Sequence, residues 1–491
     1  MLQDIQIEEK NCLRFFSFFI ILLKEKEYLV ALSLKGEIME TKKKLKLFDI
    51  ICLSFASFFS VELVASQASI GPSMVICMLI FGGAYLLCHG LICAELGGAY
   101  PDQGGIYVWV LNAFGPKWAA RTTWYYWVNV VGFVPCTLVA LIVVFQQIFV
   151  PDMSITLLTA FSIVGTWIVV ALNCISLNES KFLTNLGTIL KFVCLVMLVC
   201  GGVYTLVKNG SANEFTAETI FPVFDMNLLM LLPVYIYSLT GMDLLSCNAG
   251  MMDQPEKNVP KSVFVTGVVS IIVYILSALA VLFILPLDAI DASASMIDAI
   301  ITVYGASRML VIFFGLALVI VYGSYIFSWA IGGNATALQA GEEGELPKIF
   351  AKTNKAGAPV GPAVLLGIAS TVLLVFYGMV ASSNEGLFWT LLAFTSIIFL
   401  LPYFIMSFVF LKLRKDDPDH PRPFKVGGKV FPKVIAYLHA VFIAIAIIGY
   451  TLPPEGEDPV SYLIIVAGGV LLTVLIGEWA LNVARKNKEA K

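Results

Sequence analysis

The sequence predicts an all-α integral membrane protein with twelve transmembrane helices, and three observations support that prediction. Of its 491 residues, 59% are hydrophobic and only 13% are charged, whereas an average soluble domain carries about 25% charged residues. Long apolar stretches recur along the whole chain, separated by Gly, Pro and short polar segments. None of these stretches alternates between polar and apolar residues, so a β-barrel is not expected.

Each predicted span is long enough to cross a bilayer as a helix, which takes about 20 residues. The stretches 226–242 and 360–384 contain no charged residue. In chain order, the spans cover about 47–66, 71–94, 119–150, 154–177, 182–207, 226–250, 262–287, 308–340, 360–383, 386–411, 434–453 and 459–482.

The basic residues predict the orientation, because positively charged loops stay in the cytoplasm. If the segment that begins at Met39 is cytoplasmic, twenty-three of the 31 basic residues lie on that side and only Lys208 and Arg308 lie outside. The opposite loops are acidic. We therefore expect a multi-pass protein of the cell membrane with both termini in the cytoplasm.

Composition also excludes several classes of partner. The net charge is −3, so there is no global charge pattern for binding nucleic acid. No nucleotide-binding glycine motif is present. The histidines His89, His420 and His439 are far apart in the sequence and lack metal-ligand spacing, so neither a metal site nor a cofactor is expected. His89 and His439 are expected to be ordinary core histidines.

Residues 1–38 differ from the rest of the chain. The apolar run Phe15–Leu23 is too short to span a bilayer and lacks the small-residue cleavage site of a signal peptide. Lys35-Gly36-Glu37 can be encoded by a ribosome-binding sequence a few nucleotides before Met39. We expect residues 1–38 to be a non-native or misassigned leader and residues 39–491 to form one domain. The alternative is a real cytoplasmic or amphipathic tail.

Four motifs carry a resemblance to a known family. In this order and between these spans, they resemble the amino acid–polyamine–organocation superfamily from about Lys42 to Lys491. Within it, the chain is most similar to bacterial permeases of the glutamate/GABA-antiporter-like and polyamine branches. The motifs are Ala94–Trp109 (AELGGAYPDQGGIYVW), Gly250–Ser262 (GMMDQPEKNVPKS), Gly341–Val360 (GEEGELPKIFAKTNKAGAPV) and Asp417–Val426 (DPDHPRPFKV).

This resemblance implies a leucine-transporter-like fold. Helices 1–5 (about 47–207) and 6–10 (about 226–411) would form two inverted repeats, and helices 11 and 12 (about 434–482) would be peripheral. Helices 1 and 6 would be broken at the membrane midplane, with the substrate between the breaks. A broken helix frees N–H and C=O groups that lipid cannot satisfy, so a bound zwitterion or ion is expected to do so.

Small polar residues mark both predicted breaks. In helix 6 these are Ser238, Thr240 and Gly241, followed by Met242 and Asp243 where relatives have an aromatic residue and a glutamate. In helix 1 the usual glycine-rich run is replaced by a segment that contains Ser57, Ser60 and Glu62. The substrate-binding residues are therefore expected to be Ser57, Ser60, Glu62, Ser238, Thr240 and Gly241.

Three buried charges are the candidates for proton coupling or gating: Glu62, Lys191 and Asp243. A carboxylate at mid-membrane costs about 2.5–3.5 kcal/mol, so Glu62 needs a partner. It would bind a substrate amine, carry a proton or pair with Lys191; the structural alternative is satisfaction by serine hydroxyls. Lys191 lies about 14 Å into its span and resembles a lysine of proton-coupled relatives; the alternative is snorkelling to the interface. Asp243 either gates or caps a half-helix.

The resemblance implies a secondary active transporter of amino acids or related amines that works by alternating access. It would be proton-coupled or would exchange an amino acid for an amine, with a small molecule, H⁺ and the lipid bilayer as partners. A polyamine importer or exchanger is an alternative. A transporter-like nutrient sensor is the alternative from another class. An enzyme is not expected, because no paired acid/base or metal constellation is visible.

Overall fold

A computed structural model describes residues 59–101, 105–150, 153–174, 180–223, 226–243, 254–305, 307–355, 357–381, 383–453 and 458–489. All of them belong to one compact unit, Lys46–Lys491. Ser57, one of the predicted binding residues, lies outside the described residues.

The described part of the chain is helical and contains no strand. Within the described residues, ten helices are long and apolar enough to cross a membrane. They are α4–η1–α5 (Met74–Cys77, Met78–Gly82 and Gly83–Ala99, continuous), α7 (Pro116–Phe149), α8 (Ile155–Asn173), α9 (Ser180–Asn209), α13 (Pro255–Ile284), α15 (Arg308–Glu342), α16 (Val360–Val380), α17 (Asn384–Asp416), α18 (Phe431–Gly449) and α19 (Pro459–Glu489).

The shorter elements include the two that matter most for the site. Of the first predicted span, 47–66, the structure describes residues 59–66, and α3 begins there at Leu63. Of the sixth, 226–250, it describes residues 226–243, and α11 ends there at Ser238. These are the two spans that were predicted to be broken. The short elements are α3 (Leu63–Ala68), α6 (Ile106–Phe114), α10 (Ala217–Ile220), α11 (Met226–Ser238), η4 (Leu287–Ala289) and α14 (Ser295–Tyr304).

Some helix ends differ from the sequence-based prediction. α13 was predicted to begin at about residue 262 but begins at Pro255. Proline is favoured in the first turn of a helix, because its missing N–H would be unpaired there in any case. The polar first two turns of α13 therefore extend the helix beyond its apolar stretch.

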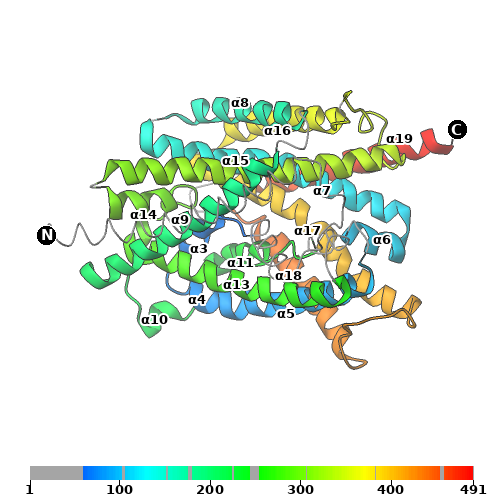
Figure 1. The fold of residues 1–491 in the computed structure, drawn as a ribbon, viewed down its shortest axis with the longest axis horizontal. Coiled ribbons are helices and arrows are strands. Elements are labelled where there is room, and N and C mark those ends of the chain that lie inside the picture. The colour runs from blue at the N-terminus through cyan, green and yellow to red at the C-terminus, as the bar shows by residue number, and fades with distance from the viewer. Residues whose placement is uncertain are drawn as a thin grey trace, which may run out of the picture. The chain divides into compact units, whose positions relative to one another are not determined.

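α7 lies at the centre of the bundle, with 89% of its most apolar window buried, and packs along α15 and α17. α19 is peripheral, with 17% buried. Within this unit, α8 runs beside α16 at one edge, and α13 runs beside α5 on the other side (Figure 1). A long, continuously apolar helix surrounded by others is expected to occupy the core of such a bundle.

The close crossing of α7 and α17 depends on Gly132. A Cβ at this position would lie 3.0 Å from side-chain atoms of Phe394 and Thr395, so a larger residue would push the two helices apart. Asn129 lies three residues before Gly132 on α7. Its carbonyl and side-chain oxygens accept hydrogen bonds from the hydroxyl of Thr395 at 2.9 and 2.8 Å. This fixed crossing holds the cavity-facing side of α7 in place.

Candidate functional site

Residues 59–62, just before α3, are not helical, and this segment is called the first break below. Its backbone groups have side-chain partners. The carbonyl oxygen of Phe59 accepts a hydrogen bond from Lys191 Nζ at 2.7 Å. The N–H of Ser60 donates to the hydroxyl of Tyr274 at 3.0 Å, and its carbonyl lies 3.3 Å from the same hydroxyl. In a bilayer no water is available for these groups, so α9 and α13 supply the partners instead.

Residues 239–243, which follow α11, are also not helical, and this segment is called the second break below. Gly241 has φ +107°, a conformation that L side chains rarely adopt. The hydroxyls of Ser238 and Thr240 donate to the carbonyl oxygens of Tyr235 and Ile236, at 3.0 and 2.6 Å. Such local bonds are typical of Ser and Thr where a helix ends.

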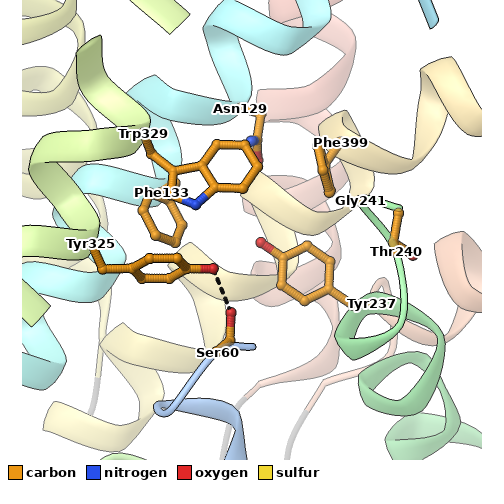
Figure 2. A pocket seen from close by; sticks show the side chains of 9 residues that line it. All are labelled: Ser60, Asn129, Phe133, Tyr237, Thr240, Gly241, Tyr325, Trp329 and Phe399. Carbon is orange, nitrogen blue, oxygen red and sulfur yellow. Dashed lines mark hydrogen bonds between the residues drawn. The ribbon is translucent and has the colours of Figure 1, made fainter. Parts of the chain in front are cut away.

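A cavity lies between the two breaks (Figure 2). A volume of about 20 Å³ in it is open to the centre of a water molecule. That is room for about one water, so side chains must move apart before a larger molecule enters. The lining residues carry no formal charge and come from the first break, α7, α11 with the second break, α15 and α17: Ser60, Asn129, Phe133, Tyr237, Thr240, Gly241, Tyr325, Trp329 and Phe399.

Five aromatic rings form a continuous wall of this cavity. They meet at 5.3 Å (Phe133–Tyr325), 5.7 Å (Phe133–Trp329), 5.9 Å (Trp329–Phe399) and 5.9 Å (Phe399–Tyr237). Most of these pairs are edge to face, the arrangement that aromatic quadrupoles favour. The hydroxyl of Tyr325 is hydrogen-bonded to Ser60 Oγ at 2.8 Å, which fixes this ring to the first break (Figure 2).

Glu62 and Lys191 lie beside this wall. Glu62 is 7% exposed, and its Oε2 has no hydrogen-bond partner. The Glu62 carboxylate interacts electrostatically with the ammonium of Lys191 and with the hydroxyl of Tyr325. Lys191 Nζ also lies 4.7 Å from the centre of the Tyr325 ring. A buried carboxylate and a buried ammonium therefore flank a cavity that has no formal charge of its own.

Asp243 occupies a separate, fully buried site. Its two carboxylate oxygens accept hydrogen bonds from Tyr126 at 2.5 Å and from Tyr403 at 2.6 Å, and the two hydroxyls are 3.0 Å apart. Tyr126 belongs to α7 and Tyr403 to α17. The carboxylate thus ties the end of the second break to the two central helices.

The described residues among those predicted fall into four groups. Ser60, Thr240 and Gly241 line the cavity, whereas the Ser238 hydroxyl is bonded to its own helix. Glu62 and Lys191 flank the cavity, and Asp243 lies in the tyrosine site. The aromatic wall and Asn129 were not predicted, because aromatic residues inside spans do not differ in sequence from ordinary packing residues. Among the described residues, no group of three or more His, Cys, Asp or Glu could hold a metal ion.

Comparison with known proteins decides the family. The family model described as "Amino acid permease" matches residues 45–476. The chain belongs to the amino acid permease family. It is 31% identical to a probable agmatine/putrescine antiporter of Lactococcus lactis, over 89% of this chain and 94% of the relative. It is 26% identical to an uncharacterized transporter of Legionella pneumophila (89% and 96%) and 24% identical to solute carrier family 7 member 13 of Mus musculus (86% and 87%).

In this permease, the four sequence motifs meet at one end of the helix bundle. A Cβ on Gly98 would lie 3.3 Å from the backbone of Glu256, so the first motif packs closely on the second. The hydroxyl of Tyr107 donates to Glu345 of the third motif at 3.0 Å. The hydroxyl of Tyr100 donates to Asp417 of the fourth motif at 3.0 Å. The first motif therefore contacts each of the other three, and the four motifs form one contact region although they are far apart in the sequence.

A buried carboxylate forms the centre of this region. Glu95 Oε2 accepts hydrogen bonds from Arg414 at 2.8 Å and from the Val426 N–H at 2.7 Å, and Arg422 lies 3.4 Å from Oε1. Burial and the Asp417 carboxylate raise the pKa of the neighbouring Tyr100 to about 12. The Tyr100 hydroxyl therefore stays protonated at neutral pH and keeps its role as a donor.

Proposed function

We propose that this permease exchanges small cationic amines across the cell membrane by alternating access. The substrate binds between the two breaks, in the cavity lined by aromatic rings. The bundle then moves around this fixed site so that it opens to one side at a time. In this conformation the cavity has room for about one water, so the proposal requires side chains to move apart before the substrate binds.

The observation that carries the proposal is the chemistry of the cavity wall. Five aromatic rings line the cavity, and the attraction of a desolvated cation to a ring face is worth about 2 kcal/mol. Glu62 lies beside them with one oxygen that has no hydrogen-bond partner. A buried carboxylate next to an aromatic wall suits a protonated amine.

An amino acid is the second candidate, favoured by the family. Its carboxylate would need donors that are free to receive it. The Ser60 N–H, which would suit a carboxylate, is already donated to Tyr274, and the Lys191 ammonium uses one of its three N–H donors on Phe59. These contacts favour an amine without a carboxylate, the substrate type in the printed name of the Lactococcus relative.

The same proposal assigns the buried charges. Glu62, Lys191 and Asp243 are the candidates for proton coupling or gating. We infer two inverted repeats within a twelve-helix bundle, with both termini in the cytoplasm, from the resemblance and from the distribution of basic residues. A sensor that binds amines without moving them is the alternative from another class.

Counterflow in proteoliposomes tests this function. Vesicles that contain the full chain are preloaded with putrescine, or with glutamate and neutral amino acids, and the matching labelled compound is added outside. We expect saturable accumulation of putrescine that is lost in Glu62→Gln. The control Glu218→Gln makes the same chemical change at an exposed position in α10 and should keep the activity.

Two outcomes would contradict the proposal. Accumulation of amino acids but not of putrescine would assign the cavity to zwitterions. Binding of putrescine without counterflow would favour a sensor.

A further inference from the structure

Two histidines that are 350 residues apart in the sequence contact each other in the structure. His89 of α5 and His439 of α18 are both 0% exposed, and His89 Nδ1 lies 3.0 Å from His439 Nε2. The other nitrogen of each ring also has a partner. His89 Nε2 lies 3.6 Å from Cys93 Sγ, and His439 Nδ1 lies 2.8 Å from Ser407 Oγ of α17. Both residues are therefore buried, hydrogen-bonded core histidines, as expected, but their contact with each other was not predicted.

The four groups form a hydrogen-bonded chain that works in either direction. One proton must lie between the two facing nitrogens, because two bare nitrogens would repel each other. Either every donor points from Cys93 towards Ser407, or every donor points the other way. Both arrangements satisfy all four groups without moving a heavy atom.

The same chain can hold one additional proton. If His89 is doubly protonated, its Nδ1–H donates to His439 and its Nε2–H donates to Cys93. His439 then carries its own proton on Nδ1 and donates it in a hydrogen bond to Ser407. An imidazolium donates from both nitrogens, and both nitrogens already face acceptors. The geometry is thus suited to the charged form as well as to the neutral one.

Two aromatic residues connect this pair to the second break. The ring of Tyr85 is stacked on both imidazoles, at 5.1 and 5.5 Å, and its hydroxyl is hydrogen-bonded to Thr240 at 3.0 Å. The ring of Tyr403 meets His89 at 5.4 Å, and its hydroxyl donates to Asp243. Aromatic faces stabilise a nearby cation. Each residue therefore touches the histidine pair at one end and the segment 239–243 at the other.

The titratable groups that face the pair are few. On α5 they are Tyr85 and Cys93, on α17 Tyr403, and at the end of α11 Asp243, whose charge acts on both Cys93 and Tyr85. The helix α13 packs along α5, and its charged residues, Glu256, Lys257 and Lys261, all lie in its first two turns. Asp243 is thus connected to the pair through Tyr403, whose hydroxyl donates to Asp243 and whose ring contacts His89.

We propose that the His89–His439 pair is a proton-binding site that is linked, through Tyr85 and Tyr403, to the segment that lines the cavity. The role of this site in transport rests on the proposed function, whereas the binding of a proton by the pair does not. A proton on the pair places a positive charge against the aromatic residues that hold Thr240 and Asp243. Uptake or release of that proton would therefore bias the position of the second break.

Nitrogen NMR tests proton binding without any substrate. The chain has three histidines, so the full chain labelled with ¹⁵N-histidine in lipid nanodiscs gives three sets of signals. The variant His420→Gln removes the histidine outside the pair and leaves only the two of interest. From about pH 4 to about pH 9, on either side of the usual imidazole range, we expect both rings to change together at one midpoint as one proton is bound. Rings that stay neutral throughout, or that titrate separately, would overturn the proposal.

A second set of variants tests the link to the break. Asp243→Asn removes the carboxylate that Tyr403 connects to the pair and should move the midpoint to lower pH, and Tyr403→Phe should move it in the same direction. Tyr437→Phe, on the exposed face of α18, is the control. An unchanged midpoint in both test variants would leave the pair as an isolated site and overturn the link.

Transport then separates this inference from the proposed function. With the substrate found by counterflow, the exchange rate should change by up to about tenfold per pH unit on one side of the midpoint, the slope of a single-proton step. His439→Gln keeps a donor and an acceptor and should flatten that profile, whereas His420→Gln should not. If no compound is transported but the pair titrates as one site, the proposed function fails and the proton site stands. A wild-type profile in His439→Gln would contradict the coupling.

Discussion

The ammonium of Lys191 in α9 donates a hydrogen bond to the carbonyl oxygen of Phe59 at 2.7 Å, at the point where the chain before α3 is not helical. The same ammonium lies over the ring of Tyr325, which forms part of the cavity wall. One side chain thus supplies the partner that water would supply outside a bilayer. It also connects the first break to the proposed binding site.

Replacing this side chain should destabilise the protein. In Lys191→Met the Phe59 carbonyl loses a buried partner, which costs about 1–3 kcal/mol, and Glu62 loses the nearby positive charge. We expect a lower unfolding temperature and no exchange. The double variant Lys191→Met with Glu62→Gln should regain part of the lost stability, because the uncompensated carboxylate is gone. Strictly additive losses in thermal unfolding would show that the two charges do not interact.

Tyr274 should matter for its hydroxyl rather than its ring. Tyr274→Phe leaves the N–H of Ser60 without its partner in a buried, non-helical segment, and the expected cost is about 1–3 kcal/mol of unfolding free energy. Tyr437→Phe removes a hydroxyl from an exposed position and should cost little. The comparison is made by thermal unfolding in the same lipid. Equal stability of the two variants would mean that another group satisfies Ser60.

Glu95 should be essential for stability at the motif-bearing end of the bundle. Its replacement in Glu95→Gln leaves Arg414 and the almost fully buried Arg422 without their carboxylate, and breaking a buried ion pair costs about 3–5 kcal/mol. Asp416→Asn breaks an exposed pair with Lys412 on the same helix, where solvent screens the two charges. The unfolding temperature of Glu95→Gln should fall far below that of Asp416→Asn. Similar values would contradict the role of Glu95 as the centre of this contact.

Asp298 predicts a pH-dependent stability. Burial and the neighbouring Asp291 carboxylate raise the pKa of Asp298 to about 6, against about 3.9 in an unfolded chain. Between these two values the folded state holds a proton that the unfolded state releases, so this group makes folding less favourable as the pH rises towards 6. Asp298→Asn should therefore be more stable than the wild type at neutral pH and should lose that advantage at about pH 3.5. The exposed Asp288→Asn is the control, and an advantage of Asp298→Asn that is the same at both pH values would contradict the argument.

The helical membrane fold was predictable because apolar length is a strong signal in a single sequence. The non-helical segments before α3 and after α11 were also indicated, since Gly241 and the hydroxyls of Ser60 and Thr240 are unusual within long apolar runs. Their exact extent was not, because helix ends such as Pro255 depend on local turn chemistry as well as on hydropathy.

Contacts between distant residues were beyond the reach of sequence patterns. The aromatic wall comes from four helices, and Tyr325 or Trp329 has the same local pattern as any residue that packs in a core. His89 and His439 are separated by 350 residues, and only the packing of α18 against α5 and α17 brings them together. Two aromatic residues of α7 likewise have partners far away in the sequence, since Tyr126 binds Asp243 and Trp127 donates to Asn334.

The most direct test of the central claim is equilibrium binding of putrescine to the full chain in nanodiscs, with one tryptophan changed at a time. Trp329→Leu removes a ring from the cavity wall, and loss of a cation–π contact of about 0.5–2 kcal/mol should weaken binding by about 2- to 30-fold. Trp479→Leu removes a tryptophan that is 66% exposed on α19 and should bind as the wild type does. Equal affinity in both variants, or no binding of putrescine at all, would contradict an amine site between the two breaks.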